Sequence, residues 1–211
     1  MQDILSALYE YCEDHSKGLD PVTSLLERST HLETTQPRML SGPTQGLFLQ
    51  MLSMIKKPRL ILEIGTFTGY SAICLAEGLC DDGILYTIDI NPETLDIAKR
   101  YIQQSRFKDR ITILEGDAMD IIPTISGNFD LVFIDADKEN YPSYYEMIRK
   151  RVVSGSMIIL DNMLWSGKVL EKTKDKRTQV LDDLNKQIKD DPGVYNVLLP
   201  LRDGINLVMV K

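Results

Sequence analysis

From residue 59 onward, short apolar runs alternate with segments whose apolar residues have helical spacing, and this alternation restricts the possible folds more than any other feature. Each of five apolar runs precedes a helical segment, which is the pattern of the βα units that build a parallel sheet. The expected strands are 59–64, 83–89, 111–115, 129–135 and 156–161, and the helices that follow them are 71 to about 80, 92–105, 118 to about 125, 141–151 and about 173–189. Two last apolar runs, 194–200 and 205–211, predict a hairpin. The sequence therefore predicts an α/β fold with a doubly wound, seven-stranded sheet whose last strand is antiparallel.

The residues before this pattern are expected to form N-terminal helices. Asp20-Pro21 is a typical helix start, because the aspartate can cap the first turn and proline is tolerated there. Ser41-Gly42-Pro43 opens a further helix, and the polar stretch 34–39 between them predicts a loop near a site. No repeat, low-complexity segment or linker divides the chain. We therefore expect one domain, 1–211, in which a helical segment at 1–57 precedes a core at 58–211.

Composition limits the class of protein. The net charge of -7 and the pI near 4.9 disfavour a broad nucleic-acid-binding surface, because phosphate contacts need clustered Lys and Arg. No apolar run reaches the ~20 residues of a membrane span, and the N-terminus lacks a basic and then apolar signal pattern. We therefore expect a cytoplasmic protein with no membrane partner. Cys12, Cys74 and Cys80 include no CxxC pair and are expected to be reduced, structural thiols.

A turn with two glycines joins the first expected strand to its helix. Gly65 and Gly69 would let the backbone approach a ligand closely, and the start of the following helix offers unpaired N–H groups. The dinucleotide fingerprint G-x-G-x-x-G is absent. Glu63 is a poor neighbour for a pyrophosphate but a good one for an amino group or a cation. The turn therefore indicates a cationic nucleoside ligand rather than NAD, although a plain βα turn can also contain two glycines.

Every expected parallel strand ends in an acidic side chain, at the edge where such sheets bind ligands. These side chains are Glu63, Asp89, Glu115 with Asp117, Asp135 with Asp137, and Asp161. Each one alone is also explained as a turn residue or a helix cap, since aspartate is common in both. Asp89 follows Gly65 by 24 residues, which suits hydrogen bonds to two ribose hydroxyls, and Asp117-Ala118 would flank the base.

The ends of the fourth and fifth strands carry a second set of polar side chains. Asp135 and the pair Asp161-Asn162 can converge, because adjacent strands lie about 4.8 Å apart. Two carboxylates and an amide oxygen suit Mg²⁺, or Ca²⁺ or Mn²⁺, and leave positions for water and substrate oxygens. The alternative is that both acids cap helices.

Lys138 lies three residues after Asp135, in the same expected loop. A free lysine, with a pKa near 10.4, is a poor base at neutral pH. A neighbouring divalent cation would lower that pKa and would also acidify a bound hydroxyl. Lys138 is thus a candidate general base, and a solvated surface lysine is the alternative.

Three motifs together carry a family resemblance. Glu63-Ile-Gly-Thr-Phe-Thr-Gly-Tyr-Ser71, Asp135-Ala-Asp-Lys-Glu-Asn-Tyr141 and Asp161-Asn-Met-Leu-Trp165 resemble the cation-dependent O-methyltransferases, which include catechol and caffeoyl-CoA O-methyltransferases. The first motif alone marks only the class I S-adenosylmethionine-dependent superfamily, whereas the combination is more specific. The resemblance extends from about residue 7 to about residue 205. It implies a Rossmann-like fold, with S-adenosylmethionine and a divalent cation as cofactors.

The resemblance also implies roles for individual residues. Those that would bind S-adenosylmethionine are Met39, Glu63, Gly65, Thr66, Ser71, Asp89, Ala118 and Asp137. Those that would hold the metal are Asp135, Asp161 and Asn162, and Lys138 would be the catalytic base. Within the first group, Asp89 would bind the ribose and Ala118 the adenine. Asp137 would face the amino group, and Met39 would close over the cofactor.

By this resemblance we expect a metal-dependent O-methyltransferase that acts on a catechol-like or other small hydroxylated aromatic molecule with vicinal oxygens. The tRNA wobble base 5-hydroxyuridine is the alternative acceptor. Basic residues at 149–151 and 168–176 are compatible with tRNA, although a solvated helix face explains them as well. Ser166 stands where the plant caffeoyl-CoA enzymes have asparagine, so caffeoyl-CoA itself is not the expected substrate. Plant relatives are dimers, which favours a homodimer.

Two other classes of protein are disfavoured. A non-catalytic binding module would not need the cofactor, metal and base positions, and here all of them are filled. An NAD-dependent oxidoreductase would have a different glycine spacing.

Overall fold

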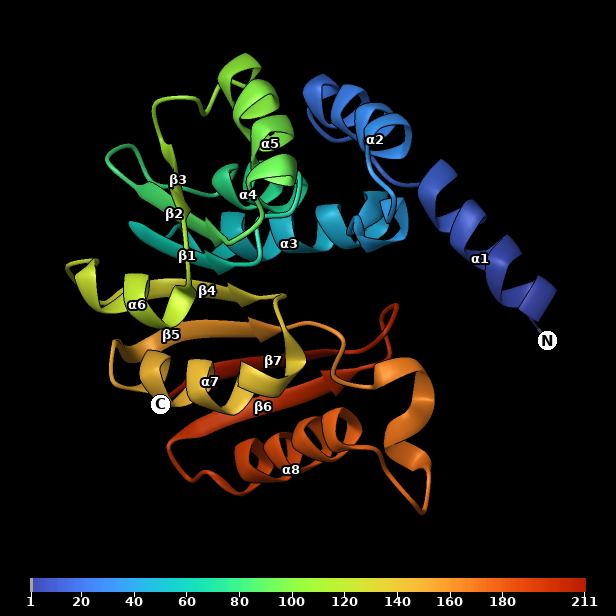
Figure 1. Cartoon of the computed structure of the whole chain (residues 1–211), viewed down its shortest axis with the longest axis vertical. Helices are drawn as coiled ribbons and strands as arrows, with labels where there is room; N and C mark the ends of the chain where they lie inside the picture. Colours follow the sequence, from blue (N-terminus) through green and yellow to red (C-terminus); the bar gives the residue numbers. More distant parts are fainter. Residues whose placement is uncertain (1) are drawn as a thin grey trace.

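The computed structural model describes residues 2–211; Met1, which the sequence analysis included in the N-terminal helical segment, lies outside them. Within residues 2–211, seven strands form one sheet in the order β3-β2-β1-β4-β5-β7-β6 (Figure 1). The strands are β1 (Leu60–Ile64), β2 (Ile84–Asp89), β3 (Ile111–Glu115), β4 (Phe129–Ile134), β5 (Val152–Leu160), β6 (Val194–Leu199) and β7 (Ile205–Val210).

The pairing of the strands confirms the predicted topology. β1 pairs in parallel with both β2 and β4, β2 with β3, and β4 with β5. β7 is antiparallel to β5 and to β6. The strand order reverses between β1 and β4, and the crevice at such a reversal is where doubly wound sheets bind their ligands.

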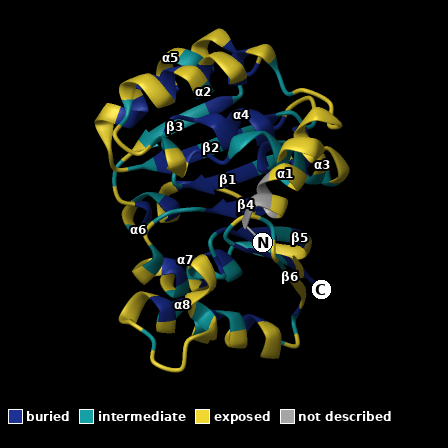
Figure 2. Ribbon diagram, turned by 90° about the vertical axis from the view of Figure 1, so that its right-hand side faces the viewer, coloured by how far each residue is buried: buried dark blue, intermediate teal, exposed yellow. Residues whose placement is uncertain are grey.

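Helices cover both faces of the sheet. They are α1 (Gln2–Asp14), α2 (Pro21–Glu33), α3 (Gly42–Lys56), α4 (Tyr70–Ala76), α5 (Pro92–Gln104), α6 (Ala118–Ile121), α7 (Tyr141–Arg149) and α8 (Lys176–Asp190), with 3₁₀ turns η1 (Pro37–Met39), η2 (Ile122–Thr124), η3 (Lys138–Asn140) and η4 (Trp165–Leu170). Helices α2 to α5 lie on one face, and α6 to α8 lie on the other (Figure 1). Figure 2 shows that the central strands are buried while the outer sides of the helices are exposed. No helix in the described part of the chain combines the length and apolar character that a membrane crossing requires.

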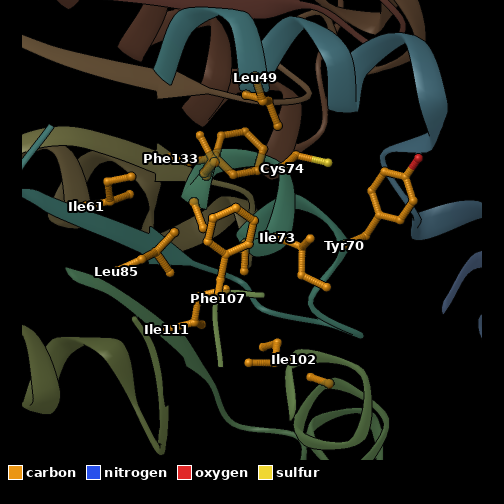
Figure 3. Packing of buried hydrophobic residues seen from close by; sticks show 14 of the residues in the cluster. Leu49, Ile61, Tyr70, Ile73, Cys74, Leu85, Ile102, Phe107, Ile111 and Phe133 are labelled. Atoms are coloured by element: carbon orange, nitrogen blue, oxygen red, sulfur yellow. The ribbon is translucent and has the colours of Figure 1, made fainter. Parts of the chain in front are cut away.

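The core on the α2–α5 face joins the N-terminal helices to the sheet. Leu49 of α3, Cys74 of α4 and Phe133 of β4 pack together there (Figure 3). The opposite face buries Leu62 and Ile64 of β1 against the α6–α8 layer. Successive side chains of a strand point to opposite faces, so β1 contributes to both cores.

Helix starts follow the caps that the sequence contains. Asp20 accepts a hydrogen bond from the backbone N–H of Val22, and Asn91 accepts one from that of Glu93. α8 begins at Lys176, three residues later than predicted, because Asp175 caps it by accepting from the N–H of Thr178. Sequence periodicity alone does not identify which of several polar residues is the cap.

Gly78 permits the close approach of the turn after α4 to α3. A Cβ atom at Gly78 would overlap the backbone of Ser53 and Met54. We predict that Gly78→Ala forces these segments apart and lowers the free energy of unfolding by about 1–3 kcal/mol, the usual cost of overpacking. Urea unfolding of wild type and variant measures this change in the free energy of unfolding. Gly18→Ala is the control, because its Cβ would meet nothing within 4 Å. Equal urea midpoints for the two variants would contradict the prediction.

Candidate active site

A large open cavity of about 2060 Å³ lies along the carboxyl ends of the strands, between the sheet edge and the segment that links α2 to α3. It is lined by all but one of the twelve residues that the resemblance assigns to the cofactor, the metal or catalysis. Those residues are Met39, Gly65, Thr66, Ser71, Asp89, Ala118, Asp135, Asp137, Lys138, Asp161 and Asn162. The exception is Glu63. The predicted cofactor, metal and base positions therefore share one cavity.

The glycine turn after β1 needs both of its glycines. Gly65 has φ +100°, and a Cβ there would overlap the carbonyl oxygen of Asp135 at the end of β4. Gly69 has φ +88° and lies against Ala98 of α5, where a Cβ would be 3.2 Å from the alanine Cβ. These backbone conformations are accessible to glycine at little cost. The turn can therefore pass directly in front of β4, which brings the first and fourth strand ends together.

Asp89 connects the end of β2 to this turn. Its Oδ2 accepts a hydrogen bond of 2.7 Å from the backbone N–H of Phe67, and its Oδ1 accepts one of 3.0 Å from that of Asn91. A carboxylate oxygen has two lone pairs, so each oxygen retains one for a ligand. Asp117 caps α6 by accepting a hydrogen bond from the backbone N–H of Met119. This is the helix-cap role that the sequence analysis gave as the alternative to ligand binding.

Glu63 lies behind the cavity wall rather than on it. Its side chain is on the same face of β1 as Ile61, and its exposure is 0%. Oε2 accepts a hydrogen bond of 2.5 Å from the hydroxyl of Thr87, whereas Oε1 has no hydrogen-bond partner in the described part of the chain. Burial, together with the charges of Asp135 and Asp89, raises the pKa of Glu63 to about 8, and the hydroxyls of Ser71 and Thr87 lower it only in part. Glu63 is therefore mostly protonated at neutral pH.

Lys138 is held at the end of β4 by two oxygens. Its Nζ lies 2.9 Å from Oδ1 of Asp135 and donates to the hydroxyl of Tyr141 at 2.7 Å. The Tyr141 hydroxyl is itself 3.1 Å from the carbonyl oxygens of Ile134 and Asp161. Tyr141 is fully buried, and burial raises the pKa of its hydroxyl well above the usual value, so the phenol stays neutral. One tyrosine thus connects Lys138 to the ends of both β4 and β5.

Asp161 is the most buried of the predicted metal ligands, with an exposure of 4%. Its Oδ2 accepts a hydrogen bond of 2.6 Å from the side-chain amide of Gln45, and its Oδ1 accepts one of 2.6 Å from the backbone N–H of Asn162. Burial and the negative charge of Asp135 raise the pKa of Asp161. Asn162 has φ +58°, a left-handed conformation that asparagine tolerates better than most residues.

The donor set at these strand ends fits a hard divalent cation. The half-buried Asp135 and the buried Asp161 repel each other, and a cation between them would remove that repulsion. Among the side chains that the structure describes, no group of three or more from His, Cys, Asp or Glu is arranged to hold a metal. A cation here would therefore depend on the amide oxygen of Asn162 and on oxygens from water or substrate, as Mg²⁺ commonly does.

The loop after β5 forms the wall beside these strand ends. Trp165 and Ser166 both have positive φ, and such strained residues cluster at ligand sites. The β6–β7 turn holds this loop in place, since the backbone N–H of Ser166 donates to Asp203 and that of Leu164 donates to the Asp203 carbonyl at 2.9 Å.

Four functional candidates were missed by the sequence analysis. Thr87 and Tyr141 bind Glu63 and Lys138, respectively, Tyr144 donates to Asp137 at 2.7 Å, and Gln45 donates to Asp161. Thr87 is inside β2, Gln45 and Tyr144 are inside helices, and Tyr141 is the first residue of α7. None of them ends a strand, which was the signal used to select the others.

Glu63 should make the stability of the protein depend on pH. An unfolded glutamate ionises above about pH 4.5, whereas the folded one stays neutral to about 8, so wild type loses stability as the pH rises between these values. We predict that Glu63→Gln is stabilising, by an amount that grows by roughly 1.4 kcal/mol per pH unit from pH 5 to pH 7.5. Urea unfolding of the ligand-free protein measures it, with Glu146→Gln on the exposed side of α7 as the control. A difference that stays constant with pH would refute this assignment.

Comparison with known proteins identifies the family of this chain. A family model described as O-methyltransferase matches residues 13–211. Caffeoyl-CoA O-methyltransferase 1 of Eucalyptus globulus is 35% identical over 181 residues, which cover 80% of this chain and 74% of that protein. Catechol O-methyltransferase of Niastella koreensis is 32% identical over 204 residues, which cover 92% of each chain.

Solved structures are similar over almost the whole chain. An O-methyltransferase from Bacillus cereus in complex with SAH has a TM-score of 0.88 and 32% identity and covers 97% of both chains. An SAH-bound methyltransferase from Podospora anserina has a TM-score of 0.90 and 26% identity, with 99% of this chain and 96% of that chain covered. The family match, the relatives and the shared fold together show that this chain belongs to the S-adenosylmethionine-dependent O-methyltransferases.

Proposed function

We propose that this protein is a metal-dependent O-methyltransferase that transfers the methyl group of S-adenosylmethionine to a hydroxyl of a small aromatic molecule with two vicinal oxygens. The observation that carries the proposal is the position of Lys138. Its Nζ lies 2.9 Å from Asp135, at strand ends that share one cavity with the glycine turn and Asp89. A candidate base, a set of hard oxygen donors and a nucleoside-type site thus border the same space.

The cofactor would occupy the β1–β2 end of this cavity. Asp89 would bind the ribose with its free lone pairs, Ala118 would border the adenine, and Asp137 would face the amino group. The glycine turn, with Thr66 and Ser71, would hold the methionine portion. Met39 is exposed on the link between α2 and α3 and would close over the cofactor. Glu63, although it does not line the cavity, would attract the cofactor electrostatically, because a nearby cationic ligand favours the ionised form of the carboxyl group.

The metal site would be made of Asp135, Asp161 and Asn162, with Mg²⁺ the expected ion and Ca²⁺ or Mn²⁺ also suitable. When bound, a divalent cation supplies Lewis-acid stabilisation of negative charge on the acceptor oxygens. The relatives support an acceptor with two adjacent oxygens, because catechol, for which one of them is named, has two adjacent hydroxyls.

Lys138 would act as the general base. Tyr141 holds its side chain at the strand ends. In its neutral amine form, after release of its own proton to solvent, Nζ would be placed to accept the proton of an acceptor hydroxyl beside Asp135. The acceptor oxygen that Lys138 deprotonates would be the nucleophile, and S-adenosylmethionine, when bound, would supply the methyl group to it. Trp165 and the loop around it would exclude water from this end. Holding the two reactants in such a geometry supplies up to about 7–11 kcal/mol in favourable intramolecular cases.

Removing the metal or one of its ligands should abolish most of the reaction and spare cofactor binding. We predict that EDTA abolishes methyl transfer by wild type and that Mg²⁺ restores it. Asp161→Asn should lower kcat/KM at least about 100-fold, because several kcal/mol of charge stabilisation are lost. Its Kd for S-adenosylmethionine, measured by calorimetry, should stay within about twofold. Asp183→Asn on the surface of α8 is the control, and full activity in excess EDTA would refute the metal dependence.

Replacing the base should reduce turnover rather than binding. We predict that Lys138→Met lowers kcat by roughly 100- to 10,000-fold, the usual contribution of general base catalysis, and leaves the Kd for S-adenosylmethionine unchanged. Lys150→Met, at the exposed end of α7, is the matched control. Wild-type turnover by the Lys138 variant would exclude lysine as the base.

The acceptor is identified by the products that form. Mass spectrometry of reactions with S-adenosylmethionine and Mg²⁺ should detect methylated catechols. It should detect little or no methylation of the matched monophenols. Hypomodified tRNA tests the alternative acceptor, 5-hydroxyuridine, and its methylation in preference to every catechol would replace the small-molecule proposal. The homodimer and the cytoplasmic location stay predictions from the sequence.

A further inference from the structure

Gln45 is a buried polar side chain that connects the N-terminal helices to the strand ends. It lies on α3 with an exposure of 1%, beside the apolar residues that pack against α4. Its Nε2 is 2.6 Å from Oδ2 of Asp161, a residue 116 positions later in the chain. Burying an amide is unfavourable unless it is hydrogen-bonded, so this contact is the reason that a glutamine is tolerated here.

The contact fixes the orientation of the Asp161 carboxylate. Gln45 occupies one lone pair of Oδ2, and the backbone N–H of Asn162 occupies one lone pair of Oδ1. With a donor on each oxygen, the carboxylate cannot rotate without losing a hydrogen bond. Each oxygen keeps one further lone pair. The Asp161 carboxylate is therefore held in one orientation, and it retains lone pairs that could bind a metal ion.

The helix that carries Gln45 is itself firmly placed. At the neighbouring Gly46, a Cβ would be 2.9 Å from Cε1 of Tyr70, so α3 lies very close to α4. The hydroxyl of Ser53, two turns further on, donates to the carbonyl of Leu75 at 2.6 Å. Groups that support a ligand are most effective when they project from rigid elements.

The chemistry of glutamine suits this position better than that of its near relatives. Its amide donates without adding charge, whereas a glutamate would place a third carboxylate beside Asp135 and Asp161. A methionine would have similar length but no donor, and would leave Oδ2 of Asp161 buried without a partner.

We infer that Gln45 is a positioning residue, which orients Asp161 as a ligand of the divalent cation through their hydrogen bond. The inference rests on the proposed function, because it assigns Gln45 a part in the same metal site. The N-terminal helical segment thus contributes directly to the chemistry of the strand ends.

Calorimetric titration of MgCl₂ into the protein tests this inference without relying on activity. Gln45→Met should raise the Kd for Mg²⁺ by about 10–100-fold, which is the usual effect of removing a residue that supports a metal ligand. Its Kd for S-adenosylmethionine should change less than twofold. Gln50→Met is the matched control, because Gln50 is on the same helix and, within the described residues, its side-chain amide donates a hydrogen bond to the sulfur of Met54 alone, at 3.9 Å. It should leave both constants unchanged.

A second variant and a second measurement separate positioning from folding. Gln45→Asn keeps a neutral amide but is one methylene too short to reach Asp161, so it should weaken Mg²⁺ binding in the same way. The shift in unfolding temperature caused by MgCl₂, measured for each variant against its own metal-free form, should be smaller than in wild type. Wild-type affinity for Mg²⁺ in both Gln45 variants would overturn the inference, as would an equal loss of S-adenosylmethionine binding. If wild type binds neither Mg²⁺, Mn²⁺ nor Ca²⁺, the metal dependence itself fails.

Discussion

The acidic groups gathered at the carboxyl edge of the sheet are the constraint on which the rest of the site depends. Glu63 and Asp161 are buried there, and the acidic neighbours of each raise its pKa further. Buried carboxyl groups are unfavourable unless they are protonated or paired with a cation. An edge of this kind favours positively charged ligands. A sulfonium cofactor is of that type, which gives the family assignment a physical reason as well as a comparative one, and the proposed divalent metal would be a second such ligand.

One glycine and one tyrosine keep this edge compact enough to work as one site. Gly65 lets the first strand end pass in front of the carbonyl of Asp135, and any side chain at Gly65 would separate them. Tyr141 then connects the β4 and β5 ends through the carbonyls of Ile134 and Asp161 and holds Lys138 at the same time. The candidate base and the candidate metal ligands therefore keep a common frame. Methyl transfer needs such a frame, because the donor and acceptor atoms must be in line.

Much of the fold was predictable because it follows from local signals. The alternation of strands and helices depends on the spacing of apolar residues, and the starts of α2 and α5 depend on Asp20 and Asn91, which are visible as caps in the sequence. Element ends were less predictable. β5 begins at Val152 rather than at 156, where Ser156 bonds the carbonyl of Phe129 beside a register shift between β4 and β5. Such irregularities depend on a neighbouring strand, which a single segment does not reveal.

The sequence by itself determined which strands end in acids, and therefore where a cavity with Asp89, Asp135 and Asp161 on its wall would form. Strand ends of a parallel sheet share one edge, so this follows without coordinates. Only the tertiary structure decided that Glu63 lies behind that wall and that Gln45 supports Asp161. The alternation of side chains along a strand assigns Glu63 to one face of the sheet. Which helix covers that face, and so buries Glu63, depends on how the elements pack. Gln45 and Asp161 are 116 positions apart in the sequence, and no local sequence pattern predicts a contact between residues so widely separated.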